Sequence, residues 1–395
     1  MERNIKLITE QLTSQKISTP VFVYDHALIL QQIAKLQSLC SAITKNYTIA
    51  YSYKTNPLLA PYICKAGCVL QVTSLQHLGQ ATKLMGDEKQ KDCFFNTASL
   101  TEKEAKIVIA ASFQIVVDSL HQIELINEVG KTLNRIVPFL IRIDTGTKIK
   151  DTPFGTSGTM LGLSCKQAKE ILSQLSKYKW LQFVGIHNHA ASQNTDLESW
   201  IQNVREIERF ILDLPDDIDL KIVNVGGGFP IPYANSTNLP IEKIFSDAFE
   251  PSMQRVLKRF PDVKFIVEPG RFLVGPTGFL IAQITNLQSS PTLEGAVVNA
   301  SLFATFNDRF LSKMTFQPPI LSDKTGDKKY FIRGSSPASI DFFGIYENLT
   351  PLKIGSTVIF GMVGAYASSM GSDFSGVVRP SEYILEGNKL ISLRQ

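Results

Sequence analysis

The sequence predicts an α/β protein in which a (β/α)8 TIM-type barrel is followed by a C-terminal β domain. Short strand-like runs alternate with longer amphipathic runs, which is typical of parallel strands joined by helices. Eight such units extend over roughly 240 residues, and eight is the number that closes a barrel. After Arg271 the runs become short and β-rich, with Gly and Pro turns between them. An open doubly wound sheet is the main alternative on pattern alone.

The elements follow in chain order. A short helix and a polar link are predicted over 1–19, a strand over 19–25 and an amphipathic helix over 27–44. The first barrel strand starts at Tyr47 and stops before the Asn56-Pro57 turn. The other barrel strands are predicted at 68–74, 93–97, 114–119, 137–143, 183–189, 222–226 and 265–268. The helices are predicted at 57–66, 75–86, 101–111, 120–131, 165–177, 195–213 and 241–260, and the later strands at 279–284, 295–299, 329–333, 357–360 and 383–385.

This pattern divides the chain into two domains. Residues 27–272 are predicted to form the barrel, and 1–26 with 273–395 the β domain, which the strand at 21–24 is expected to join. A length of 395 residues is typical of two domains with a large core.

Composition excludes several classes of partner. The 40 basic and 36 acidic residues give a net charge of +4, and no run of like charge occurs. Nucleic acid and anionic membranes are therefore not expected as partners. No apolar stretch reaches the roughly 18 residues of a membrane span, and no apolar signal core follows the first residues. The five cysteines show no disulfide framework, so we expect a cytoplasmic protein.

Lys54 follows the first barrel strand, among aromatic and apolar neighbours. A lysine that loses hydration there becomes a better nucleophile toward a carbonyl carbon. Taken alone, a strand-end lysine more often points into water. The residues at the ends of the later strands instead favour a functional role for Lys54.

The carboxyl ends of strands 6, 7 and 8 carry the segments 185–193, 226–230 and 268–271. In a barrel, active residues collect at this end of the strands. The sequence therefore brings a lysine, two histidines, a Gly-rich loop and a Glu/Arg pair to one rim.

The loop Gly226-Gly-Gly228 follows strand 7, where barrels commonly bind phosphate. Glycines let backbone N–H groups approach an anion closely. A simple tight turn is the alternative for such a run on its own.

His187 and His189 lie two residues apart, on the same side of a strand. The pair invites a metal site, but no other histidine falls at a later strand end. We therefore predict no metal and a structural role for His187.

Glu268 has a specific use if the ligand contains a pyridine ring, because a carboxylate keeps the ring nitrogen protonated. A surface ion pair between Glu268 and Arg271 is the alternative. Taken together, a lysine for an imine, a glycine loop for a phosphate and a carboxylate for a ring nitrogen describe pyridoxal 5′-phosphate.

These motifs resemble the fold-type III pyridoxal-phosphate enzymes, the ornithine, diaminopimelate and arginine decarboxylases and their carboxynorspermidine relatives. The resemblance extends from about Thr19 to about Gly376 and keeps the family order. It rests on Tyr51-Ser-Tyr-Lys-Thr-Asn56, His187-Asn-His-Ala-Ala-Ser192, Gly226-Gly-Gly228, Glu268-Pro-Gly-Arg271 and Gly364-Ala-Tyr366.

The resemblance implies a role for each matching position. Lys54 would hold the cofactor as a Schiff base, His189 would stack on its ring and Glu268 would meet the ring nitrogen. The phosphate would be surrounded by Ser192, Gly227, Gly228, Gly270, Arg271 and Tyr366. The implied fold is the alanine racemase-like fold, with active sites formed across a homodimer interface. The implied reaction is α-decarboxylation of a small amino-acid-like substrate.

The sequence departs from the family at several positions. The family commonly has a cysteine and then an acidic residue in the segment matching 333–341; here these positions are Pro337 and Ala338, and only Asp341 fits. Proline has no side-chain proton to give, so Lys54 or water is expected to protonate the product carbon. An acidic residue on strand 2 is replaced by Gln71, and another nearby is replaced near His77.

Three functions remain open at this stage. The first is decarboxylation of an amino acid or an amino-acid conjugate in a specialised biosynthetic pathway. The second is racemisation, which needs a second base that the sequence does not offer. The third is an inactive regulator of a true decarboxylase, which the loss of the cysteine favours and the retained Lys54 and Glu268 oppose.

The substrate's far end is predicted to be acidic or neutral. Ser312 stands where the family has a diamine-binding acid, and Arg309 is expected to neutralise the neighbouring Asp308. A buried ammonium without a partner costs several kcal/mol. Arg309 or Lys313 could instead bind a distal carboxylate; solvated loop residues are the alternative. Asp341 and its neighbours are expected to reach the substrate in the partner's active site.

Overall fold

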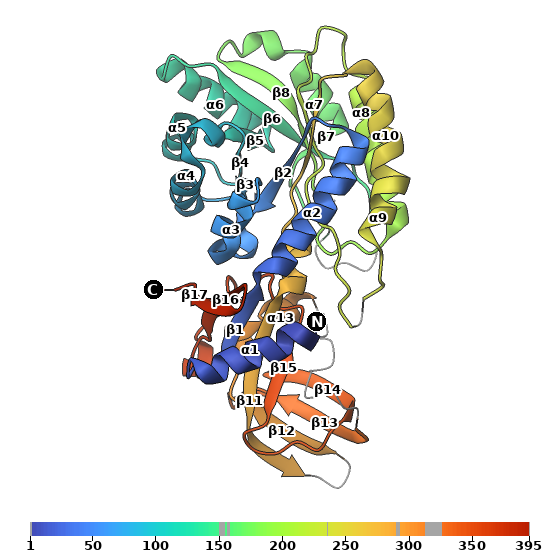
Figure 1. Cartoon of the computed structure of the whole chain (residues 1–395). Coiled ribbons are helices and arrows are strands. Elements are labelled where there is room, and N and C mark those ends of the chain that lie inside the picture. The colour runs from blue at the N-terminus through green and yellow to red at the C-terminus, as the bar shows by residue number, and fades with distance from the viewer. Residues whose placement is uncertain are drawn as a thin grey trace.

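The computed structural model describes residues 2–149, 155, 159–234, 236–289, 293–312 and 326–394. Within them the chain forms a closed barrel and a separate sheet, which lie at opposite ends of the molecule (Figure 1). The predicted fold, an α/β barrel with a C-terminal β domain, is confirmed. None of the helices in these ranges is both long and apolar enough to cross a membrane.

The barrel contains eight parallel strands in the order β5-β4-β3-β2-β10-β9-β8-β6, and pairing of β5 with β6 closes it. A short additional strand, β7 (Leu163–Ser164), pairs with β6 outside the ring. The barrel strands are β2 (Tyr47–Ser52), β3 (Val69–Val72), β4 (Phe94–Asn96), β5 (Gln114–Val117), β6 (Val137–Asp144), β8 (Leu181–His187), β9 (Ile222–Asn224) and β10 (Lys264–Val267).

Helices surround the barrel, and several begin at a residue suited to cap them. Ser74, Thr101 and Ser119 each accept a backbone N–H from the first turn of the helix that follows, as Ser164 and Asp196 also do. These caps let the chain turn sharply from strand to helix. The helices are α2 (His26–Ile43), α3 (Ala60–Lys65), α4 (Leu75–Gln90), α5 (Glu102–Ala110), α6 (Leu120–Thr132), α7 (Cys165–Leu172), α8 (Leu197–Leu212), α9 (Ile241–Ile244) and α10 (Glu250–Arg259), the last two joined by a π-helical turn.

The second sheet has the order β14-β13-β12-β11-β1-β16-β17, with β15 paired to β11. Strand β1, from the N-terminus, lies between β11 and β16, as the sequence predicted for 21–24. Helix α1 (Glu2–Ser14) covers this sheet with Ile8 and Leu12. The strands are β1 (Val21–Asp25), β11 (Gly278–Ser289), β12 (Glu294–Val298), β13 (Lys328–Arg333), β14 (Phe342–Leu349), β15 (Thr357–Phe360), β16 (Ser381–Glu386) and β17 (Lys389–Ser392).

The two regions meet near α11 (Arg271–Val274), and the predicted boundary at 272/273 falls inside this helix. Strands β14 and β17 were not predicted. Strand β14 contains Gly344 at a φ of 152°, and β17 has only one buried residue, so neither gives the usual strand pattern.

Trp200 of α8 packs against the loop that follows β9. Its ring stacks on Phe229 with 5.5 Å between the ring centroids, and its Nε1 donates to the Asn194 carbonyl at 3.1 Å. Both rings are buried. Because Phe229 directly follows the glycine loop, this packing holds that loop in place.

We predict that Trp200→Ala lowers the free energy of unfolding by about 3–5 kcal/mol, because it leaves a cavity against Phe229. Urea denaturation measures the change. Leu212→Ala, at an exposed position of the same helix, is the control and should change stability little. Equal stabilities of the two variants would contradict the packing argument.

Candidate active site

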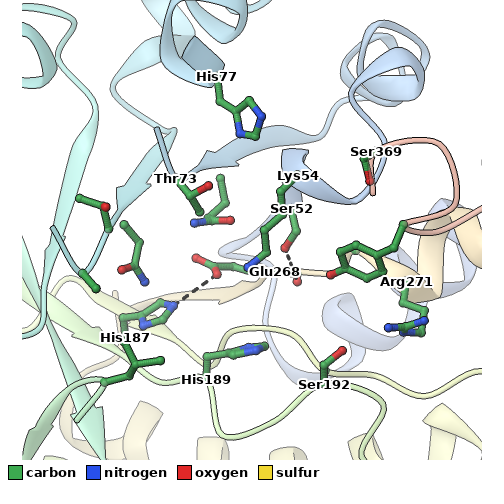
Figure 2. Close-up of a pocket in the computed structure, with 18 of the residues that line it drawn as sticks. Ser52, Lys54, Thr73, His77, His187, His189, Ser192, Glu268, Arg271 and Ser369 are labelled. Atoms are coloured by element: carbon green, nitrogen blue, oxygen red, sulfur yellow. Dashed lines mark hydrogen bonds and ion pairs between the residues drawn. The ribbon is translucent and has the colours of Figure 1, made fainter. Parts of the chain in front are cut away.

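Lys54 lies in a single 3₁₀ turn, Tyr53–Thr55, directly after β2. Tyr51 fixes this turn, because its hydroxyl donates to the Asn56 carbonyl at 3.0 Å. The Lys54 side chain enters a cavity of about 780 Å³ at the carboxyl ends of the barrel strands (Figure 2). Lys54 is exposed in the single chain, so the expected loss of hydration is not found there.

Glu268 follows β10 and is buried beneath the cavity. Its carboxylate lies 3.3 Å from Nε2 of His187 and accepts a hydrogen bond from Nδ2 of Asn224 at 2.8 Å. Burial alone would raise the pKa of Glu268, but His187, Asn224 and Lys54 together hold it below its usual range. The cavity therefore contains a buried, ionised carboxylate. His187, predicted to be only structural, contacts it and lines the cavity.

The glycine loop passes between neighbouring strand ends at very short distances. A Cβ added at Gly226, Gly227 or Gly228 would lie 2.1–2.2 Å from a backbone carbonyl oxygen. Gly226 and Gly228 also have positive φ angles, of 68° and 100°. Only glycine fits these positions, and Gly228 lines the cavity.

His189 lies on the lower side of the cavity in Figure 2, below Glu268. The Gly227 N–H donates to its Nδ1 at 3.3 Å. Burial, followed by the charges of Arg142 and Lys54, holds the pKa of His189 well below its usual value. The ring is therefore neutral and can lie against another flat ring.

Arg271 occupies the opposite end of the cavity from His187. Its Nη1 is 2.8 Å from Oδ2 of Asp308 and donates to the Tyr233 hydroxyl at 2.8 Å, and its guanidinium lies 4.8 Å from the ring centroid of Tyr366. Burial opposes the charge, but Tyr233 and Asp308 raise the pKa of Arg271. Ser192, Gly228, Gly270 and Tyr366 line the cavity with Arg271.

The partner of Asp308 corrects one prediction. The sequence suggested that Arg309 neutralises Asp308, but Asp308 pairs with Arg271 instead. Arg309 donates to the Phe342 and Phe343 carbonyls and is not among the described residues that line the cavity.

Asp341 is also outside the cavity. It is fully buried, and its two carboxylate oxygens accept the backbone N–H groups of Leu302, at 2.8 Å, and Ser336, at 3.0 Å. It therefore holds its own loop together, and its contact with the substrate in a partner's site stays a prediction. Lys313 lies outside the described residues.

Sequence reasoning missed part of a polar group that lines the cavity. Thr73, Asn96 and Arg142 line it without having been predicted, and so do Gln71 and His77, which were noted only as departures from the family. Burial, only partly offset by the nearby Asp118, lowers the pKa of Arg142. Arg142 could not be recognised as a site residue because it lies within a strand of mostly apolar residues. The departure from the family near His77 was the one indication in the sequence.

This set of residues fits pyridoxal 5′-phosphate. An amine, a buried carboxylate and a neutral flat ring surround the middle of one cavity, and a guanidinium with small side chains forms one end (Figure 2). The glycine loop carries no side chains and reaches the cavity at Gly228, so that its backbone N–H groups can approach an anion closely.

The comparison with known families agrees with this chemistry. Residues 29–275 match the family model described as the pyridoxal binding domain of pyridoxal-dependent decarboxylases. The chain belongs to the pyridoxal-dependent decarboxylases. It is therefore an enzyme that uses pyridoxal 5′-phosphate to decarboxylate an amino acid, as the sequence predicted.

Its relatives include several diaminopimelate decarboxylases. That of Methanocaldococcus jannaschii is 26% identical, covering 97% of this chain and 90% of the relative. That of Helicobacter pylori is 26% identical, covering 96% of this chain and 94% of the relative.

Solved structures show the same fold. The M. jannaschii diaminopimelate decarboxylase superimposes with a TM-score of 0.87, at 24% identity and with coverage of 97% of this chain and 91% of that one. The lysine/ornithine decarboxylase of Vibrio vulnificus, solved with putrescine, has a TM-score of 0.80, 19% identity and coverage of 98% and 99%.

We predict that Glu268→Gln lowers kcat by roughly 100-fold while the cofactor stays bound, because the amide cannot hold a proton on the ring nitrogen. Steady-state assays and cofactor absorbance measure the two effects. Glu128→Gln, at an exposed position of α6, is the control. Unchanged turnover of Glu268→Gln would remove this carboxylate from the site.

Proposed function

We propose that the enzyme removes the α-carboxylate of an amino acid or amino-acid conjugate whose far end carries no net positive charge. One observation supports this proposal above the others. Among the described residues that line the cavity, the carboxylates are those of Glu268 and Asp308, and each is already paired. A distal ammonium would enter without a carboxylate, which costs several kcal/mol.

The cationic groups of the cavity support the same proposal. Lys54, Arg142 and Arg271 line it together with three histidines. This potential favours anionic groups, namely the cofactor's phosphate and a carboxylate of the substrate. This surplus of positive charge lies in the cavity itself and does not involve Arg309.

Each residue then has a role in the reaction. Lys54 would hold the cofactor through its side-chain amine. Glu268 would keep the ring nitrogen protonated, and the neutral ring of His189 would lie against the cofactor's ring. The cofactor supplies an electron-withdrawing ring that accepts the electron pair when carbon dioxide leaves. The phosphate would be held by Ser192, Gly227, Gly228, Gly270, Arg271 and Tyr366.

Diaminopimelate is a second candidate substrate. The relatives described above are named diaminopimelate decarboxylases and are matched over nearly their whole length. The far end of diaminopimelate carries an amine and a carboxylate, so it has no net charge and agrees with the charge argument. A substrate of a specialised pathway stays the first candidate because Gln71, Pro337 and Ala338 depart from the family pattern.

We also propose that the enzyme is a homodimer and lies in the cytoplasm. An apolar surface formed by Phe303, Phe310, Ile340 and Phe374 surrounds a groove close to Met370, which lines the active site. Ile340 and Phe374 are 59% and 58% exposed. Exposed apolar patches of this kind mark interfaces, and a second copy that covers this one would reach the cavity's rim.

The substrate prediction is tested by kcat/KM for ornithine, lysine, norleucine, diaminopimelate and carboxylate-bearing conjugates, side by side. Norleucine is the matched control for lysine, because it has the same chain length without the distal charge. We expect ornithine and lysine to be at least about 100-fold poorer than the best neutral or acidic substrate. Ornithine or lysine as the best substrate would refute the charge argument.

The dimer prediction is tested by sedimentation velocity of Phe374→Asp. A charge at this patch should weaken the dimer by about 100-fold or more and reduce activity with it. Ile136→Asp, at an exposed apolar position of the barrel, is the control and should stay dimeric. A fully active wild-type monomer at assay concentrations would contradict the proposal.

A further inference from the structure

The product carbon needs a proton after carbon dioxide leaves, and the usual donor of the family is absent. Pro337 and Ala338 carry no exchangeable side-chain proton, in this chain or in a second copy. Asp341 has both oxygens engaged by its own loop. The donor must therefore come from the cavity that contains Lys54.

His77 lies in the first turn of α4 and faces this cavity from above in Figure 2, on the side away from His189. Its ring meets the Tyr53 ring edge-on, with 5.0 Å between the centroids. The Tyr53 hydroxyl donates to Gln80 at 2.9 Å, which holds that ring in place. The His77 ring is thus held by packing against Tyr53.

The two nitrogens of His77 have different surroundings. Within the described part of the chain, Nδ1 is buried and has no hydrogen-bond partner. Because the residue lines the cavity and is only half-buried, Nε2 is the nitrogen that faces it. The other two imidazoles of the cavity differ, since His187 contacts Glu268 and His189 accepts from Gly227.

Lys54 and Tyr53, from the turn after β2, are the titratable side chains placed against His77. Burial, followed by the Lys54 charge, lowers the pKa of His77. The N-terminus of α4 adds to this effect, because its dipole disfavours a positive ring. His77 therefore rests as a neutral ring in the cavity that Lys54 also lines, and once protonated it gives its proton up readily.

We propose that His77 is a catalytic residue that carries a proton from Lys54 to the carbon that loses carbon dioxide. The Nε2 lone pair takes a proton from the Lys54 ammonium, which becomes a neutral amine. The Nε2–H bond then breaks, and a C–H bond forms with the electron pair left by the departing carboxylate. The ring begins and ends neutral, and Lys54 recovers its net proton from water. This step deepens the proposed decarboxylation and rests on it.

The first test uses the cofactor-free protein and needs no substrate. Proton–carbon NMR follows the titration of the His77 ring in the wild type and in Lys54→Gln. Removal of the lysine charge should raise the pKa of His77, because that charge opposes protonation of the ring. An unchanged His77 titration would show that the two side chains are not coupled and would overturn the proposal, whatever the substrate is.

The second test is turnover of His77→Gln in deuterium oxide, with the best substrate found in the assays above. We expect kcat to fall by about 10²–10⁴-fold, with cofactor affinity unchanged. Deuterium, placed on one face of the product carbon by the wild type, should appear on both faces because water now delivers it. His121→Gln, on the exposed surface of α6, is the control and should behave as the wild type.

Two outcomes of the second test would overturn the proposal. Unchanged kcat and stereochemistry would mean that Lys54 delivers its proton directly. A slower variant that still labels one face would mean that His77 only positions other groups. If no substrate is decarboxylated at all, the proposed function fails, and the NMR titration still decides whether His77 and Lys54 are coupled.

Discussion

The buried carboxylate of Glu268 constrains the rest of the barrel rim. An ionised carboxylate that leaves water is very costly unless charge and hydrogen bonds replace its hydration. Here His187 at the end of β8 and Asn224 at the end of β9 supply the replacement. Three neighbouring strands are thus held in register by one side chain. The glycine loop follows from this arrangement, because the Glu268 carbonyl lies where a side chain of Gly227 would begin.

The second sheet completes the site from the other side. The Tyr366 N–H donates to the Thr55 carbonyl at 3.0 Å, and the Asn56 amide donates to the Gly364 carbonyl at 3.2 Å. These bonds tie the turn that carries Lys54 to the segment after β15. The buried Arg271–Asp308 pair crosses the same junction. Lys54 and Arg271 therefore keep their relative positions only while both sheets are folded.

The architecture could be predicted from the sequence because it follows from hydrophobic periodicity. The main residues of the site could be predicted because they belong to motifs at the ends of the strands. Lys54, His189, Glu268 and Arg271 meet around one cavity as expected. Prediction from the sequence failed where tertiary packing decides the direction of a side chain. Arg309 donates to the first two carbonyls of β14, and Asp308 pairs with Arg271. Neither contact can be predicted from the neighbouring residues in the sequence.

The most direct test of this account is the protonation state of the cofactor's ring nitrogen. Nitrogen NMR of the enzyme loaded with ¹⁵N-labelled pyridoxal 5′-phosphate reports it without any substrate. A carboxylate that stays ionised beside the ring predicts the chemical shift of a protonated pyridinium in the wild type, and loss of that shift in Glu268→Gln. A wild-type enzyme with an unprotonated ring nitrogen would contradict the central role given to Glu268.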